Sequence, residues 1–347
     1  MKRVAILATL MLMVLLSCQP QGEEPYQPTP YELPTPLFFP SENNIPANNP
    51  MTEEGIALGE RLFHEEKSCS TCHHKEFSFE GGPEATLEHL GTEHTMLPLI
   101  NLAWNTTGLG WKSQVASLEE MVYAAYTDPL EINTDTSTVV KRLQQSEVYP
   151  ELFKKAFGTD EISFVQVEKA IAQYVRSLVF ADSKFDRYLR GEEQLSQDEL
   201  NGSLLFTTEN GADCFHCHGG GANALFTTHL SYNNGLDASS DETFKAPTLR
   251  NIALTAPYMH DGRFSTLDEV IDFYSEGVQY SENISPLMHH VMQGGVQLTP
   301  QEKQQLKAFL YTLTDTSLRG AEGDEPRRAH RPEGGNKATF SSLSVAK

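Results

Sequence analysis

The chain lacks long apolar runs. After its first seventeen residues, no stretch approaches the eighteen or more apolar residues that a membrane-spanning helix needs. Basic residues are also few: 26 Lys and Arg stand against 47 Asp and Glu, which gives a formal net charge of −21. This charge argues against nucleic acid and against a broad anionic membrane surface as binding partners. Alternating apolar and polar residues are scarce too, so a mainly α-helical fold is expected.

Cysteine is scarce, and four of the five cysteines belong to two Cys-x-x-Cys-His runs. These runs comprise Cys69, Cys72 and His73, and Cys214, Cys217 and His218. The spacing is typical of c-type haem attachment, in which the thiols bind the porphyrin and the His ligates the iron. A zinc site uses the same residue types, but here the pairs are far apart and each has its own His. A redox dithiol would need a βαβ context, which is not apparent. The sequence therefore predicts two covalently bound haem c groups.

The N-terminus has the features of an export signal. A basic start at Lys2 and Arg3 precedes a short apolar stretch, which predicts a signal peptide over residues 1–17. The fifth cysteine, Cys18, ends a run that resembles a bacterial lipobox. It predicts a lipid-anchored periplasmic protein with no other membrane contact; an ordinary cleaved signal with an incidental cysteine is the alternative. Residues 18–50 are rich in proline and predict an extended tether, whose apolar segment 37–40 is expected to pack on a domain.

Two stretches of the chain repeat one pattern. Each haem motif follows a short helical segment with a glycine and a Leu-Phe end, at residues 59–63 and 202–206. Each repeat closes with an amphipathic segment, Val165–Val179 in the first and Pro300–Leu313 in the second. We therefore expect two cytochrome c-like domains, and the expected boundaries are 51–182 for the first domain, 183–318 for the second and 319–347 for a disordered tail.

One longer stretch makes the pattern more specific. Residues 244–262, which run from Phe244-Lys245-Ala246-Pro247 to His260-Asp261-Gly262, resemble the signature loop of the bacterial dihaem cytochrome c peroxidases and their MauG-like relatives. The resemblance covers the chain from about Leu37 to Thr314. It implies that the two haems face a shared interface. It also implies that the N-terminal haem, with His73, is peroxidatic, and that the C-terminal haem, with His218, transfers electrons.

The resemblance assigns two catalytic residues. Pro129-Leu130-Glu131-Ile132 is similar to the family's Pro-x-Glu-Met run, so Glu131 is expected to act as general base and then general acid on peroxide. Trp111 matches the tryptophan that the family places between its haems. Lys112-Ser113-Gln114 follows it in place of the family's Asp-Gly-Arg, so its local contacts are expected to differ.

The resemblance implies a sixth ligand for the C-terminal iron, which is Met in the peroxidases and Tyr in MauG. Met292 is the predicted ligand because Val291-Met292 resembles the family's Val-Met. Met288 is the second choice, and His289 or His290 stays open. Met259 lies in the signature loop, where proximity to haem need not mean ligation.

Two further sites follow from the resemblance. Some relatives carry a distal His on the N-terminal haem, and His89 or His94 is expected in that role. The family also binds calcium at the interface. Thr255 and Pro257 match two of the donors, while His94 stands where the family usually has Asn.

The sequence therefore predicts a peroxidase that reduces hydrogen peroxide with electrons from a small periplasmic cytochrome c or copper protein. MauG-like oxidation of a protein or organic substrate and a non-catalytic dihaem electron carrier are the alternatives. Since relatives are often homodimers, a homodimer is the expected assembly.

Overall fold

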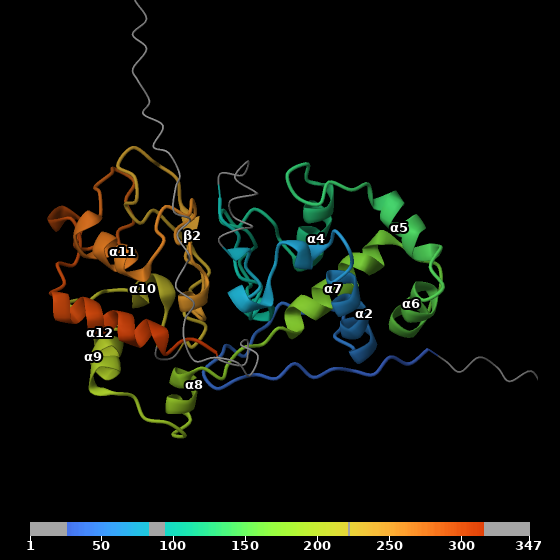
Figure 1. Cartoon of the computed structure of the whole chain (residues 1–347), viewed down its shortest axis with the longest axis horizontal. Coiled ribbons are helices and arrows are strands. Elements are labelled where there is room, and N and C mark those ends of the chain that lie inside the picture. The colour runs from blue at the N-terminus through green and yellow to red at the C-terminus, as the bar shows by residue number, and fades with distance from the viewer. Residues whose placement is uncertain (1–25, 83–93, 221–222, 316–347) are drawn as a thin grey trace, which may run out of the picture.

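The fold consists of helices joined by long irregular segments. The computed structural model describes residues 26–82, 94–220 and 223–315. Figure 1 shows two helical units side by side, with α2 to α7 in one and α9 to α12 in the other. The first unit contains α2 (Glu53–Phe63), α4 (Leu118–Thr127), α5 (Thr136–Gln144), α6 (Tyr149–Phe157) and α7 (Phe164–Ser177). The second contains α8 (Lys184–Leu189), α9 (Gln197–Phe206), α10 (Phe215–His218), α11 (Leu267–Asp272) and α12 (Pro300–Tyr311), with strands β1 (Ser231–Tyr232) and β2 (Phe244–Lys245).

The prediction of a mainly helical fold is confirmed. The two short strands β1 and β2 pair antiparallel, with Ser231 opposite Lys245. None of the helices in the described ranges is long and apolar enough to cross a membrane.

Helices α2 and α7 cross closely at the centre of the first unit. A Cβ placed on Gly59 would lie 1.9 Å from the carbonyl oxygen of Ala170 and 2.9 Å from Cβ of Tyr174. Glycine is thus required for this helix approach. Beside the crossing, Phe63 is fully buried and its ring contacts Tyr174 edge-on.

The second unit repeats this crossing with α9 and α12. A Cβ on Gly202 would lie 2.0 Å from the carbonyl oxygen of Gln305 and 2.8 Å from Cβ of Phe309. Phe206 at the end of α9 is fully buried, and its ring centroid lies 5.3 Å from that of Phe309. The repeat in the sequence therefore corresponds to a repeated packing arrangement.

Separate apolar cores support the two units. The core of the first unit takes its buried residues from 58–178, and that of the second from 185–313. Helix α8 belongs to the second core because Phe185 packs there against Phe226 and Phe309.

The proline-rich segment lies along both units, in blue in Figure 1. Phe39 is buried and meets the ring of Trp104 edge-on at 4.9 Å. The predicted packing of the apolar segment 37–40 is thus confirmed for Phe39, whereas Leu37 and Phe38 are exposed. Trp104 itself is a core residue. The backbone of Phe38 accepts a hydrogen bond from Ala224 N, which ties the segment to the second unit.

Buried polar residues lie at and beside the boundary of the units. Arg250 is 2 % exposed and forms a bidentate ion pair with Asp186 inside the second unit, while its Nε donates to the carbonyl of Ala224. Asn251 of the second unit donates to Ser78 Oγ of the first at 3.0 Å. Because a buried amide needs partners, the Asn251 contact helps to fix the relative placement of the units.

Candidate active site

The C-terminal Cys-x-x-Cys-His run forms the short helix α10 and the residue before it. His218 Nδ1 lies 3.1 Å from the carbonyl oxygen of Pro247. A carbonyl can only accept, so Nδ1 carries the proton and Nε2 keeps its lone pair. This is the tautomer that suits a metal ligand held by a backbone carbonyl.

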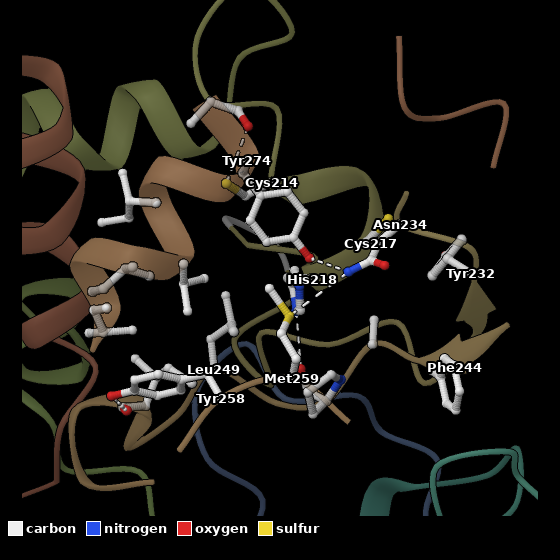
Figure 2. Close-up of a pocket in the computed structure, with 18 of the residues that line it drawn as sticks. Cys214, Cys217, His218, Tyr232, Asn234, Phe244, Leu249, Tyr258, Met259 and Tyr274 are labelled. Carbon is white, nitrogen blue, oxygen red and sulfur yellow. Dashed lines mark hydrogen bonds between the residues drawn. The ribbon is translucent and has the colours of Figure 1, made fainter. Parts of the chain in front are cut away.

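A cavity of about 210 Å³ opens beside His218 and both cysteines of this run. That is on the order of fifteen times the space one water needs, which indicates room for a cofactor. Apolar side chains from the second unit form much of its wall, and Thr95 to Pro98 and Trp111 of the first unit complete it. Figure 2 shows the labelled residues Tyr274, Asn234 and Met259 at the His218 side of the cavity.

The surroundings favour uncharged forms of the presumed haem-binding groups. Burial lowers the pKa of His218 to about 4, against the effect of its backbone hydrogen bonds. Burial likewise raises the pKa of the Cys214 thiol to about 12 and that of Cys217 to about 11, with Asp213 adding to both. A neutral imidazole is what a His ligand of a haem iron requires.

The N-terminal run has the same local arrangement. The turn Cys69–Thr71 precedes His73, and His73 Nδ1 lies 2.7 Å from the carbonyl oxygen of Phe79. Burial raises the pKa of the Cys69 thiol to about 11, and the charge of Glu131 contributes in the same direction. Glu131 therefore lies within electrostatic range of this attachment site, on the exposed turn that follows α4.

The two runs do not come together. Cys69 packs against the first core and Cys214 against the second. One zinc site made from both pairs is excluded by this separation, and each run keeps its own His. The residues present thus fit two covalently attached haems, one in each unit.

Trp111 reaches from the first unit to the cavity of the second. Its Nε1 donates to the carbonyl of Thr95 at 2.6 Å, and its own carbonyl accepts from Lys245 N. Thr95 in turn donates through its backbone N and its hydroxyl to the carbonyls of His260 and Met259. The predicted bridging tryptophan is consequently held by hydrogen bonds on both sides of the interface.

The position of Met292 argues against the prediction that it is the sixth ligand of the C-terminal haem iron. Its side chain is 79 % exposed on the turn Val291–Gln293 and does not line the cavity. The resemblance of Val291-Met292 to the family's Val-Met was local and did not account for the direction of this turn. Met288, His289 and His290 do line the cavity.

Tyr274 is the residue that the sequence analysis missed. It lies on the π-helical turn Phe273–Gly277, a type of irregularity often found at functional sites. Asn234 Nδ2 donates to the Tyr274 hydroxyl at 3.0 Å and lies 3.9 Å from Met259 Sδ (Figure 2). Burial raises the pKa of Tyr274, and the hydrogen bond from Asn234 opposes this. The available signal was a tyrosine that follows the apolar residues Val270, Ile271 and Phe273, together with the resemblance to the MauG-like relatives, for which Tyr was named as the ligand.

For several other predicted site residues, the structure gives a position at most and does not test the predicted role. Cys18 and His89 lie outside the described residues. His94 packs against the rings of Phe244 and His260, with centroids at 5.4 and 5.5 Å. Thr255 and Pro257 line the cavity wall, and the calcium site there stays a prediction.

The fold and these motifs have counterparts among known proteins. A family described as "Di-haem cytochrome c peroxidase" matches residues 53–194. The methylamine utilization protein MauG of Methylophilus methylotrophus is 30% identical over 313 residues, covering 83% of this chain and 91% of that protein. The chain belongs to the dihaem cytochrome c peroxidase and MauG family. Membership implies haem cofactors and a peroxidase-type oxidoreductase.

Other family members are similar over comparable lengths. Cytochrome c551 peroxidase of Nitrosomonas europaea is 29% identical over 310 residues, covering 81% of this chain and 84% of that one. The solved structure of a MauG-like protein associated with microbial copper homeostasis is 31% identical, with a TM-score of 0.70, covering 88% of this chain and 98% of that one. The chain's relatives thus include both peroxidases and MauG proteins.

Proposed function

We propose that this family member is a MauG-type dihaem enzyme, which uses hydrogen peroxide to oxidise a protein or another organic substrate. The observation that carries the proposal is the half-buried Tyr274, which lines the His218 cavity, together with the exposure of Met292. This reverses the order of the functions expected from sequence, where a Met ligand favoured simple peroxide reduction.

Tyr274 and His218 would serve as the protein ligands of the C-terminal haem iron when the haem is bound. A phenolate ligand needs stabilisation of its negative charge, and the amide of Asn234 donates to its oxygen. His218 is already neutral and oriented by the Pro247 carbonyl. An oxygen ligand stabilises oxidised iron, as an enzyme that withdraws electrons from a substrate requires.

The N-terminal unit would supply proton transfer. When bound, the haems provide the electron-transfer chemistry and the place where peroxide reacts. Glu131 is solvent-exposed and near Cys69, so it can accept a proton from the attacking peroxide oxygen and return it to the departing one. Trp111, held by Thr95 and Lys245, lines the His218 cavity from the first unit and would pass electrons between the two haems.

A second function is favoured by a separate observation. Met259 lines the cavity, and its sulfur lies 3.9 Å from Asn234 Nδ2. A thioether ligand from Met259 would raise the reduction potential and suit peroxide reduction with a small cytochrome c or copper protein as donor.

Replacing each candidate ligand in the dihaem holoprotein tests the proposal. Tyr274→Phe should change the optical spectrum of the C-terminal haem and raise its potential, on the order of 100 mV or more. Tyr258→Phe is the matched control, because Tyr258 also lines the cavity but donates to the Ile252 carbonyl. If Met259→Leu changes the spectrum and Tyr274→Phe does not, the second function is supported instead.

Turnover separates the two functions directly. A donor-dependent peroxidase should oxidise a reduced small cytochrome c continuously when peroxide is present. The MauG-type enzyme should oxidise that cytochrome poorly and should consume peroxide when an oxidisable organic substrate is added. Rapid cytochrome oxidation by wild-type protein would contradict our proposal.

We further propose export to the periplasm with lipid on Cys18, on the strength of the N-terminal sequence and the covalent haem motifs. Mass spectrometry of the purified native protein tests this: a diacylated N-terminal Cys18 is expected, and an unmodified one would contradict it.

A further inference from the structure

A second group of metal-ligating side chains lies at the edge of the C-terminal attachment helix, and the proposed function uses none of its members. Its members are Asp213, His216 and His289, and one ligand atom from each lies within 4.8 Å of the others. Asp213 directly precedes Cys214, and His216 lies between the two cysteines of the run. His289 comes from a distant part of the sequence, on the loop before the turn Val291–Gln293.

The three side chains converge on one point. The Asp213 carboxylate places Oδ1 2.7 Å from His216 Nδ1 and Oδ2 3.4 Å from His289 Nδ1. The two imidazole rings are nearly perpendicular, with centroids 5.3 Å apart. Glu209 approaches from the solvent side, with Oε1 3.7 Å from His216 Nε2.

We propose that Asp213, His216 and His289 form a binding site for a divalent late transition-metal ion, with Cu²⁺ preferred. Metal–ligand bonds of about 2.0–2.2 Å imply ligand atoms roughly 3–3.5 Å apart. The two contacts of Asp213, at 2.7 and 3.4 Å, lie near this range, and all three ligand atoms lie within 4.8 Å of one another. Two imidazoles and one carboxylate suit Cu²⁺ or Zn²⁺, whereas Ca²⁺ and Mg²⁺ prefer oxygen ligands. At a site of this kind Cu²⁺ binds more tightly than the other divalent first-row ions.

Burial and exposure are suitable for such a site. The Asp213 side chain is 6 % exposed, so its position is fixed, while that of His289 is 42 % exposed and leaves a route for the ion. Glu209 or a water could complete the coordination. The bound ion would tie the His289 loop, whose Met288 lines the haem cavity, to helix α10.

Copper titration of the chelator-treated dihaem holoprotein tests the site. We expect the wild type to bind one more Cu²⁺ than the variant His289→Ala, and its copper EPR signal to show coupling to imidazole nitrogen. Loss of the His289 ligand should weaken this binding event by more than about 100-fold, because even changes beside metal ligands cost 10–100-fold. His216→Gln should have the same effect.

His290→Ala is the matched control. His290 follows His289 directly, but its Nε2 lies 3.0 Å from the carbonyl oxygen of Glu209, outside the cluster. Its copper affinity should stay within about 3-fold of the wild type. Subtracting the number of Cu²⁺ ions bound by His289→Ala from the number bound by the wild type corrects for copper bound elsewhere, for example at His330.

A haem assay on every variant guards against a loss of folding. His289 lies outside the attachment run, so His289→Ala should retain two haems even if His216→Gln does not. Copper should also raise the melting temperature of the wild type and not that of His289→Ala. Equal copper affinity in wild type and His289→Ala would overturn the proposal, since Asp213 would then merely hydrogen-bond two imidazoles.

Discussion

The two units share one scaffold and differ in what surrounds their haem-binding residues. Gly59 and Gly202 allow the same close helix crossing, and His73 and His218 each face a backbone carbonyl through Nδ1. Glu131 stands exposed near the first attachment site, whereas Tyr274 lines the cavity beside the second. If the proposed roles hold, the same scaffold places a proton-transfer group near one haem and a protein ligand at the other.

Glu131 should account for the largest difference between the units. Glu131→Gln keeps the size of the side chain but removes its proton transfer, so peroxide turnover should fall by about 10²–10⁴-fold with both haems retained. Steady-state peroxide consumption measures this. Glu147→Gln, an exposed change in the same unit, should leave turnover unaltered. Normal peroxide turnover by Glu131→Gln would contradict a catalytic role for Glu131 and the functional difference between the two units that depends on it.

Buried ion pairs should show where the units depend on each other. Arg176 pairs with Glu119 inside the first unit, and Arg250 pairs with Asp186 near the interface. The pair loses its cation in Arg176→Met or Arg250→Met. Each change should lower the free energy of unfolding by about 3–5 kcal/mol, because a largely buried carboxylate then has no counter-charge. Calorimetry of the holoprotein measures the loss.

The matched control for these variants is Arg190→Met. Arg190 bonds to Asp182 and Glu192 at the surface, so its loss should cost less than about 1 kcal/mol. We also expect Arg250→Met to affect the unfolding of both units and Arg176→Met to affect mainly the first. If Arg176→Met destabilised both units equally, the division into two cores would have no counterpart in the free energy of unfolding.

The glycine crossings should be equivalent. Gly59→Ala and Gly202→Ala each push a methyl group against a backbone carbonyl, so each should destabilise the protein by about 1–3 kcal/mol. Chemical denaturation followed by circular dichroism measures this, with Ala57→Ser on the exposed side of α2 as control. A large effect at only one glycine would break the correspondence between the repeats.

The smallest effect concerns pH. Burial would raise the pKa of Glu119, but hydrogen bonds from Arg176 and Asn49 and the charge of Arg176 bring it below its usual value. Burial would likewise raise the pKa of Asp186, but the hydrogen bonds and the charge of Arg250, with the hydrogen bonds of Ser183, bring it below its usual value. Both pairs therefore stabilise the fold fully above the unfolded pKa values of about 4, and this contribution declines as pH falls further.

Removing Arg250 should reverse the direction in which the pKa of Asp186 is shifted. In Arg250→Met, Asp186 stays buried without its partner, so its pKa should rise above the unfolded value and protonation should relieve the cost. The stability difference between variant and wild type should thus shrink as pH falls from 7 to 4. Denaturation curves at several pH values measure it, and a constant difference would contradict the assignment of the cost to a buried charge.

Much of the scaffold could be predicted from local sequence. The segments Val165–Val179 and Pro300–Leu313 are the observed helices α7 and α12 to within two residues, because apolar periodicity is a local signal. The packing of Phe39 and the core position of Trp104 also follow from their apolar surroundings. Glycine before each Leu-Phe end indicated the helix crossings.

The position of Tyr274 in the second haem site could not be predicted from local sequence. Tyr274 reaches the cavity through a π-helical turn and meets Asn234 from forty residues earlier, and neither fact has a periodic signature. Met292 failed for the converse reason: its local sequence resembled a ligand segment, but the turn directs it to solvent. Likewise, His216 and His289 become neighbours only in the folded chain.

The hydrogen bonds of Thr95 and Trp111 across the interface have a consequence for how this protein can be divided. Residues of the first unit complete the wall of the cavity that contains His218. A C-terminal fragment expressed alone would therefore leave its porphyrin edge open to water and to unselective electron exchange. The two halves make one catalyst, and neither is a smaller working version of it.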